Sequence, residues 1–436
     1  MPFAKANARN MHYLQNTIPE NMHFREKLYL VLCIMLAFVL RLCYNKTNHS
    51  KEVFGLTHDE KALLRTPEPL KKGDKVAVIC LSSGIIGEPY CAHQKELGLS
   101  RLRQFGLEPV FTQHALMGKD YITAHPEARA ADLKAAFLDD SIKGIITSIG
   151  GIETFRTFPY LMHDEEFKNA VREHPKLFLG FSDTTNNHFM LHRLGLQTFY
   201  GQAFMCDIAE LSGDMLPYSK AQFESCFASF HGRKITPSDV WYEDRTDFSA
   251  AAVGTMPVSH NEEHGYELLQ GSAVFEGELL GGCIESMGEM LLAGNIDRFG
   301  ELLSEDMEKC PQLAEDLKNQ IEITRKYNIF PTADEWRGNI LFAETSEVMP
   351  PPEMLRDYLV AIKEQGVFEN LSGIIIGKPM NERYYEEYKS VWCDVVGNSK
   401  IPILYNVNFG HATPRAILPY GATARVDADK QEITLL

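Results

Sequence analysis

The sequence predicts an α/β protein with two bodies: an N-terminal, mainly parallel α/β domain and a C-terminal, β-rich α/β domain. Apolar, β-branched segments of strand length alternate with helix-forming segments from residue 75 onward. Such alternation is typical of a mainly parallel sheet that helices cover on both faces. A polar, turn-rich stretch at 236–270, expected to be a linker, interrupts the alternation, which then resumes. The length of 436 residues also suits two or three domains.

The first body is expected to span residues 66–235. Its expected strands are short apolar runs at 75–83, 108–112, 144–151, 176–181 and 196–204. Two helices are expected between them. One covers 91–105, where leucines recur at helical spacing, and the other covers 125–139, which is rich in alanine and has Pro126 near its start.

The second body is expected to span residues 271–436. Its expected strands lie at 339–347, 373–379 and 401–411, with helices at about 351–366 and 382–396. The end of the chain predicts a β-hairpin, because turn residues at 427–429 separate two β-rich runs. Residues 295–336 form an insertion that is charged, helical in pattern and without an expected strand.

Composition excludes several classes of function. The net charge of −16 argues against a nucleic-acid partner, which needs a basic face. The nine cysteines are odd in number and irregularly spaced, and no CxxC pair occurs. Neither a disulfide framework nor a cysteine zinc site is therefore expected. Free thiols suit a reducing compartment, so we expect a cytoplasmic catalytic body.

Residues 1–65 are expected to be a separate extension with an apolar segment at 28–44. Thirteen apolar residues run without a break from 28 to 40, whereas a membrane-spanning helix needs about 20. Arg41 extends the run if its side chain snorkels toward the membrane surface. A signal anchor, an uncleaved leader and sequence upstream of the true start all fit, so membrane anchoring stays open.

Ser182 lies where an apolar strand ends in Gly-Phe and a polar segment opens a helix. Ligands of open α/β sheets bind outside the carboxyl ends of the strands. This turn therefore offers an exposed hydroxyl together with backbone N–H groups that suit an oxyanion. The motif is G-F-S-D rather than the full G-x-S-x-G pattern. Serine is also a preferred helix N-cap, and local sequence leaves both roles open.

The segment SIGGIETFR, residues 148–156, places two glycines between a strand and a helix. Small residues allow close backbone approach, and their amides suit an anion or an oxyanion. The phosphate-loop patterns GxxxxGK and GxGxxG do not occur there. A simple tight turn fits the same residues.

Glu344 and His411 each follow an apolar strand of the second body, so both are expected at sheet ends. A serine hydrolase needs a base that takes the hydroxyl proton and an acid that holds the base. Ser182, Glu344 and His411 supply these groups in chain order. Taken singly, the histidine also fits a structural role and the glutamate an ion pair.

The segment HNEEH, residues 260–264, fits the H-x-x-E-H pattern of a zinc-peptidase family. Such motifs work because a helix aligns two histidines one turn apart. Pro257 before the segment and Gly265 after it disfavour a long helix. No metal site is therefore expected.

Seen together, several segments between residues 66 and 436 resemble the LD-carboxypeptidase family of serine peptidases, which includes the microcin C self-immunity peptidases. The segments that carry the resemblance, in order, are PLKKGDKVAVICLSSG, SIGGIETFRTFPYL, LGFSDTTNNHFML, EGELLGGCIES, ILFAETSE, GIIIGKP and IPILYNVNFGHATPRAILPYGA. The resemblance implies an active site in the cleft between the two domains.

The resemblance also implies roles for individual residues. Ser182 matches the family's nucleophile, Glu344 the acid and His411 the base. The amides of Gly151 and Asp183 correspond to the oxyanion hole. In addition, Arg156 matches an arginine after the glycine pair that orients the loop or meets a substrate carboxylate. No cofactor or metal is implied.

The two branches of the family differ in substrate. LD-carboxypeptidases cut a peptidoglycan tetrapeptide before its terminal D-Ala, whereas the immunity branch cuts a peptidyl-nucleotide antibiotic at its carboxamide link to AMP. The longer middle region and the E-T-S-E segment resemble the immunity branch, whose members place an aromatic side chain near the linker to stack on adenine. Trp241 or Phe248 suits that substrate-binding role, and packing within a loop suits them equally.

Three features depart from the family pattern. Cys283 stands where an asparagine usually follows the Gly-Gly pair, Gln202 stands where a proline often follows glycine, and the insertion at 295–336 is long. These departures concern substrate preference more than catalysis. The insertion suits a lid over the cleft or support for a homodimer.

The sequence therefore predicts a serine peptidase that hydrolyses an amide bond in a peptidoglycan-derived LD-peptide or a peptidyl-nucleotide. Its expected partner is that small substrate. The alternative is a non-catalytic, membrane-tethered α/β protein that binds cell-wall peptides or nucleotides.

Overall fold

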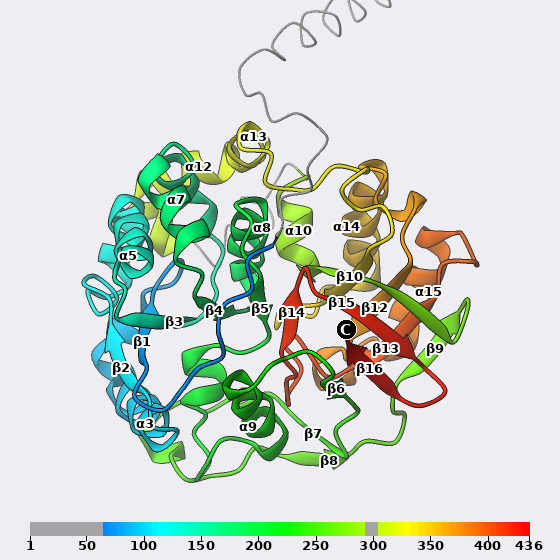
Figure 1. The fold of residues 1–436 in the computed structure, drawn as a ribbon, viewed down its shortest axis with the longest axis horizontal. Helices are drawn as coiled ribbons and strands as arrows, with labels where there is room; N and C mark the ends of the chain where they lie inside the picture. The colour runs from blue at the N-terminus through cyan, green and yellow to red at the C-terminus, as the bar shows by residue number, and fades with distance from the viewer. Residues whose placement is uncertain (1–63, 293–303) are drawn as a thin grey trace, which may run out of the picture. The chain divides into compact units, whose positions relative to one another are not determined.

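The computed structural model describes residues 64–292 and 304–436 (Figure 1). The apolar segment at 28–44 lies outside these residues, as does the rest of the expected extension at 1–65 except Leu64 and Arg65. In the two described ranges, no helix is both long enough and apolar enough to cross a membrane.

The first sheet has six strands in the order β14-β5-β4-β3-β1-β2. Five strands run parallel, and the sixth, β14, pairs antiparallel with β5. The strands are β1 (Lys75–Ile79), β2 (Glu108–Phe111), β3 (Ile142–Thr147), β4 (Leu177–Gly180), β5 (Thr198–Tyr200) and β14 (Leu418–Tyr420). The chain reverses its direction across the sheet between β1 and β3, the place where such folds bind ligands.

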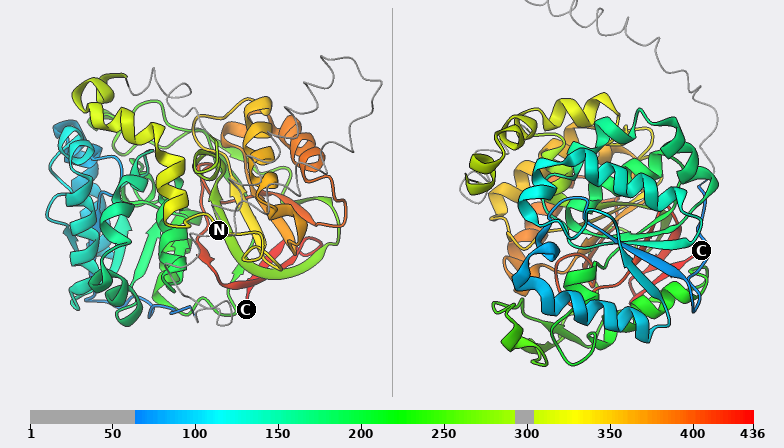
Figure 2. Two further views of the ribbon diagram at one scale, coloured as in Figure 1. Left: turned by 90° about the horizontal axis from the view of Figure 1, so that it is seen from above. Right: turned by 90° about the vertical axis from the view of Figure 1, so that its left-hand side faces the viewer.

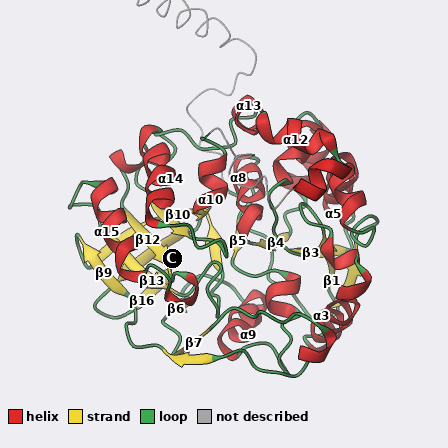
Figure 3. Ribbon diagram, turned by 180° about the vertical axis from the view of Figure 1, so that it is seen from behind, coloured by secondary structure: helices red, strands yellow, loops and turns green. Residues whose placement is uncertain are grey.

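Helices cover both faces of the first sheet, as Figure 3 shows. The main ones are α3 (Ala92–Gln104), α5 (Pro126–Leu138), α7 (Glu165–Glu173) and α8 (Thr185–Arg193). Alternate residues of β1 enter two different apolar clusters: Ala77 and Ile79 join one, and Val76 and Val78 join the other. The strand is therefore buried on both faces, which explains its unbroken apolar sequence.

The second sheet has eight strands in the order β6-β16-β15-β10-β11-β12-β13-β9. Its parallel centre is β10 (Val274–Cys283), β11 (Ile340–Glu344), β12 (Gly373–Gly377) and β13 (Ile403–Val407). Antiparallel strands flank that centre: β6 (Lys234–Ile235), β16 (Glu432–Leu435), β15 (Thr423–Asp427) and β9 (Glu267–Gln270). Helices α10 (Ile284–Glu289), α14 (Pro352–Glu364) and α15 (Tyr385–Val396) pack with it. The two-domain α/β prediction is confirmed, and the expected C-terminal hairpin is β15–β16.

Each domain contributes one strand to the sheet of the other. The domain boundaries expected from the sequence do not account for this exchange. β14 belongs to the C-terminal part of the sequence but completes the first sheet beside β5 (Figure 1). Conversely, β6 lies before residue 236 but joins the second sheet. A three-residue and a two-residue strand carry too short a pattern to reveal their sheet from sequence.

The stretch at 236–270, expected to be a linker, is also partly structured. It contains a small sheet formed by β7 (Val240–Tyr242) and β8 (Ser259–Asn261), and β9 closes one edge of the second sheet. These strands are short and lie at edges, where one face stays in contact with solvent. Because they contain polar residues, these strands lack the apolar pattern by which a strand is recognised in the sequence.

The described part of the insertion, residues 304–336, contains α12 (Pro311–Lys318) and α13 (Gln320–Lys326) and no strand. These helices pack against the first domain, through α4 (Lys119–Ala124) and α6 (Phe158–Leu161) (Figure 2). Ion pairs join the two parts: Lys119 with Asp306, and Lys309 with Asp120. The insertion thus lies within the second domain in sequence but packs against the first.

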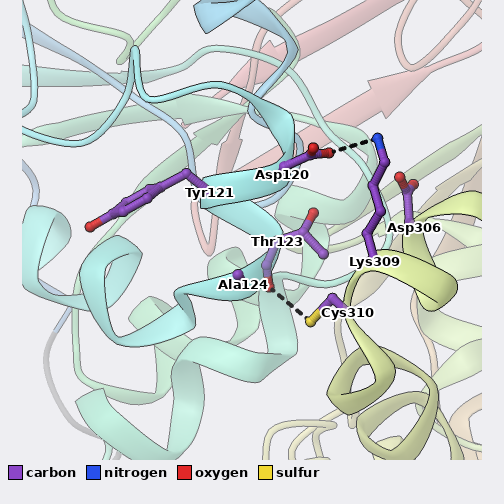
Figure 4. Close-up of a pocket in the computed structure, with 7 residues that line it drawn as sticks. All are labelled: Asp120, Tyr121, Thr123, Ala124, Asp306, Lys309 and Cys310. Carbon is purple, nitrogen blue, oxygen red and sulfur yellow. Dashed lines mark hydrogen bonds and ion pairs between the residues drawn. The ribbon is translucent and has the colours of Figure 1, made fainter.

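A cavity of roughly 350 Å³ lies between α4 and the insertion (Figure 4). Its lining residues are Asp120, Tyr121, Thr123, Ala124, Asp306, Lys309 and Cys310. It includes none of the residues expected to carry catalysis.

Candidate active site

Ser182 sits on a sharp turn between β4 and a short 3-10 helix, Ser182–Thr184, that leads into α8. Its φ of 65° lies in the left-handed region, which non-glycine residues rarely adopt. Such strain is typical of functional turns and persists only where neighbouring structure holds it. Ser182 therefore occupies the kind of strained strand-to-helix turn on which nucleophilic serines are found.

The glycine loop after β3 presses directly against this turn. A Cβ added at Gly150 would lie 2.6 Å from the Cβ and 2.7 Å from the Oγ of Ser182. Gly151 has a φ of 145°, and a Cβ there would lie 2.3 Å from Ser82 Oγ. At both positions neighbouring atoms leave no room for a side chain, so glycine is required. The Asp183 carboxylate fixes the approach by accepting a hydrogen bond from the Thr154 amide at 2.9 Å.

Glu344 and His411 come from the second sheet and lie against each other. Glu344 is the last residue of β11, and His411 follows β13. The Nδ1 of His411 is 2.8 Å from Glu344 Oε2, and the His411 amide donates to the same oxygen at 3.1 Å. Both side chains are buried. The structure therefore brings the expected acid and base together in the orientation that a catalytic pair needs.

Tyr200, which no sequence pattern singled out, connects the two halves of the site. Its hydroxyl donates to Glu344 Oε1 at 2.6 Å and accepts from the Ser182 amide at 3.3 Å. Burial and the nearby Glu344 carboxylate raise the pKa of this phenol well above its ordinary value, so it remains a donor. In the sequence Tyr200 ends an apolar strand and looks like any core aromatic, so only the fold reveals this role.

The other imidazole nitrogen, Nε2 of His411, is 3.0 Å from Glu347 Oε2. Burial alone would lower the pKa of His411, but the carboxylates of Glu344 and Glu347 outweigh that effect and raise it to about 10. The ring also lies edge-on to Phe181, with centroids 4.9 Å apart. In this arrangement the imidazole is a cation held between two carboxylates.

A second buried carboxyl supports the loop that carries Glu347. Glu285 Oε1 accepts hydrogen bonds from the amide and hydroxyl of Ser346, both at 2.8 Å. The thiol of Cys283 lies 3.3 Å from Glu285 Oε2. Burial, and then the charge of Glu344, raise the pKa of Glu285 to about 7.

Within the described residues, one set of side chains has the types and spacing of metal ligands: Cys283, Glu344 and His411, whose donor atoms lie within 4.8 Å of one another. Two of these donors are already hydrogen-bonded to each other as acid and base. The set is therefore explained by the contact between the expected acid and the expected base.

Comparisons with known families and structures agree with this geometry. The family model described as the LD-carboxypeptidase N-terminal domain matches residues 76–201, and the C-terminal domain model matches residues 276–426. The chain belongs to the LD-carboxypeptidase family. Together the two matches include Ser182, Glu344 and His411, and the chain is a serine carboxypeptidase-type hydrolase. Family membership thus favours the peptidase prediction over the non-catalytic alternative.

Curated relatives in the family include a putative carboxypeptidase of Treponema pallidum, 28% identical over 84% of this chain and 93% of its own length. A probable murein peptide carboxypeptidase of Bacillus subtilis is 29% identical over 63% of this chain and 73% of its own length.

Among solved structures, an MccF-like protein from Streptococcus pneumoniae in complex with AMP is 45% identical, with a TM-score of 0.76. The match covers 84% of this chain and 99% of that protein. The microcin C7 self immunity protein MccF in complex with aspartyl sulfamoyl adenosine has a TM-score of 0.65 at 19% identity, over 85% of this chain and 97% of that protein, and therefore shows a shared fold.

Among the other predicted positions of this LD-carboxypeptidase family member, Arg156 is buried, and its Nε and Nη1 atoms donate to protein groups. Its guanidinium pairs with Glu153 at 2.6 Å, with Asp316 of α12 at 2.7 Å, and with the carbonyl of Thr123 at 2.6 Å. Two roles are expected for Arg156: orienting the glycine loop or meeting a substrate carboxylate. These contacts fit the first of them. Gln202 likewise donates to the carbonyls of Ser219 and Arg415, at 2.7 and 3.2 Å.

The two aromatic candidates differ in accessibility. Trp241 is 8% exposed and stacks on His260, with ring centroids 4.3 Å apart. The neighbouring Tyr242 pairs with Thr413, so this small sheet lies beside the loop that carries His411. Phe248 is 53% exposed, and its carbonyl lies 3.0 Å from His93 Nε2.

The HNEEH segment forms strand β8 and the turn after it, not a helix. His260 pairs with Glu243 at 2.8 Å, whereas His264 stacks on Tyr385. Between them, Glu262 pairs with the buried Lys378 at 3.0 Å. The two histidines thus have separate structural partners.

Proposed function

We propose that this enzyme hydrolyses the amide bond that joins an aminoacyl or peptidyl group to a nucleotide, using Ser182, His411 and Glu344 as a catalytic triad. The observation that carries the proposal is the 45% identity to an MccF-like protein bound to AMP, extending over 99% of that protein. The placement of the three side chains supports it, because Glu344 ends a strand and Ser182 and His411 each follow one.

In the proposed mechanism, His411 Nε2 removes the proton of Ser182 while Glu344 holds Nδ1. The serine oxygen attacks the amide carbonyl, and the amides of Gly151 and Asp183 stabilise the resulting oxyanion. His411 then protonates the leaving nitrogen. Water, activated by the same base, hydrolyses the acyl-enzyme and restores Ser182.

For the nucleotide, Phe248 is the better aromatic candidate of the two. Its ring is more than half exposed, whereas one face of Trp241 is already covered by His260. An exposed aromatic face suits stacking on a base. Arg156 is proposed to act on the glycine loop, since its Nε and Nη1 donors are occupied by protein groups.

A murein-derived LD-peptide is the second candidate substrate. The 29% identity to a probable murein peptide carboxypeptidase of Bacillus subtilis favours it, over a smaller part of this chain. Both candidates need the same triad and differ in the leaving group.

The test is a mass-spectrometric assay of two substrates with the wild type and Ser182→Ala. One substrate is an aminoacyl amide of adenosine 5′-phosphoramidate, and the other is a muropeptide tetrapeptide ending in D-Ala. Release of the nucleotide by the wild type alone supports the proposal. Release of D-Ala alone assigns the second candidate, and equal activity of Ser182→Ala on either substrate rejects the triad.

A further inference from the structure

Glu347 occupies the imidazole nitrogen of His411 that the reaction needs. A serine hydrolase base must accept the serine proton on Nε2, and that nitrogen of His411 is 3.0 Å from the Glu347 carboxylate. An imidazole held by carboxylates at both nitrogens keeps both its protons. As long as the pair persists, His411 has no lone pair with which to deprotonate Ser182.

The two carboxylates differ in how free they are to move. The Glu344 side chain is 0% exposed and is fixed by Tyr200, while the Glu347 side chain is 63% exposed. The backbone just before Glu347 is anchored, because Ser346 donates its amide and hydroxyl to Glu285. Glu347 can therefore change its rotamer while the strand end and Glu344 stay in place.

Bond geometry indicates which substrate group can replace His411 as the partner of Glu347. A carbonyl carbon attacked by Ser182 must come within about 3–3.5 Å of its Oγ. An α-amino nitrogen lies two bonds from that carbon, about 2.5 Å away by standard bond lengths and angles. Since the proposed mechanism places this Oγ beside His411 Nε2, a free α-ammonium on the substrate would come close to Glu347, which now pairs with that nitrogen.

We propose that Glu347 is a substrate-responsive counter-ion: it holds His411 inactive in the free enzyme and transfers to the α-ammonium group of the scissile aminoacyl residue. The inference rests on the proposed function and adds to it the class of acyl group that the site prefers. When Glu347 leaves, the Nε2 proton passes to water, and the neutral imidazole can take the serine proton. The newly bound ammonium also disfavours a second positive charge on His411.

Other charged and titratable groups around His411 stay in place in this step. Glu344 remains on Nδ1, and Arg415 donates to the His411 carbonyl at 2.7 Å while pairing with Asp207. The remaining ones nearby are Cys283, Glu285 and Asp244. Among the carboxylates in direct contact with the imidazole, only that of Glu347 is exposed.

The first experiment compares two substrates that differ at one group. They are the aminoacyl amide of adenosine 5′-phosphoramidate with a free α-ammonium and the same compound N-acetylated. For the wild type at pH 7 we expect kcat/KM to favour the free amine by about tenfold or more, the size of one charge-assisted contact. Glu347→Gln should reduce this preference to near unity.

Glu353→Gln is the matched control, since it removes an exposed carboxylate on the adjacent α14 and leaves His411 untouched. It should keep the wild-type preference. The inference is overturned if Glu347→Gln keeps the preference for the free amine, or if it loses activity equally on both substrates.

A second experiment needs no substrate. The rate at which a fluorophosphonate labels Ser182 should rise with pH as His411 loses its proton, with Ser182→Ala as the unlabelled control. Glu347→Gln should lower the midpoint of that rise by about one to three pH units, because an opposite charge beside the imidazole is gone. If the wild type releases no nucleotide from either compound, the proposed function fails. The labelling midpoint then still decides the counter-ion role: a lowered midpoint supports it, and an unchanged midpoint overturns it.

Discussion

Tyr200→Phe tests whether the contact between the two halves of the site contributes to catalysis. The change deletes one oxygen, and with it the 2.6 Å hydrogen bond to Glu344 Oε1 and the longer, 3.3 Å bond from the Ser182 amide. A hydrogen bond to a charged group contributes about 1.5–3 kcal/mol. Glu344 keeps its two bonds from His411, so we expect the folded state to lose about that amount from the Glu344 contact and less from the longer Ser182 contact.

The share of this energy that reaches the reaction barrier bounds the effect on rate. A loss of about 1.5–3 kcal/mol corresponds to about a 10- to 160-fold fall in kcat at most. KM should change little, since Tyr200 is fully buried and offers no surface to a substrate. The assay is steady-state hydrolysis, paired with urea unfolding of the same protein.

Tyr405→Phe is the control for the loss of a buried phenol. Tyr405 donates at 2.9 Å to the neutral carbonyl of Tyr385. It should cost about 1 kcal/mol of stability and leave kcat unchanged. If Tyr200→Phe also leaves kcat unchanged while stability falls, Tyr200 is structural only and the reasoning is refuted.

Three further predictions concern the groups around the triad. Because burial raises the pKa of Glu285 to about 7 from 4.5, the folded protein keeps a proton that the unfolded chain has lost, so stability should fall as pH rises from about 4.5 to 7. Glu285→Gln should flatten that fall by about 3 kcal/mol at most, as measured by urea unfolding at pH 5 and 8. Gly150→Ala should lower kcat about 100-fold with a folded circular-dichroism spectrum, because the new methyl displaces Ser182; unchanged activity would contradict the close packing. Asp316→Asn removes one anionic partner of Arg156 and should cost about 1–3 kcal/mol in unfolding free energy, whereas a neutral result would mean that the pair contributes nothing.

Apolar patterns were sufficient to predict the long buried strands and helices. The expected strand at 75–83 became β1 and the helix at 351–366 became α14, because burial on one or both faces imposes an apolar pattern along the whole segment. The edge strands β6, β9 and β14 carry two to four residues each. Their pairing depends on partners far away in the sequence, which no local pattern records.

Prediction of the site has the same limit: residues whose role depends on a partner far away in the sequence are missed. Ser182, Glu344 and His411 were predicted because each has a chemical function that suits a strand end, and the family resemblance ordered them. Tyr200 and Glu347 were not predicted. One resembles a core residue and the other a surface charge, and each acquires its role only through a partner 144 or 64 residues away, Glu344 or His411 respectively.

The strand exchange explains why control of the site is expected at a side chain. After His411 the chain crosses to the first domain, where Arg415 pairs with Asp207 at 2.9 Å and β14 adds to the first sheet beside β5. Gln202 donates to the Arg415 carbonyl, so this departure from the family pattern helps to fix the crossing. His411 is thus tied to the second sheet before it and to the first sheet after it. Opening the domains would break those backbone hydrogen bonds, whereas moving the exposed Glu347 carboxylate breaks one ion pair. The lower-cost movement is the one that frees the proposed catalytic base, His411.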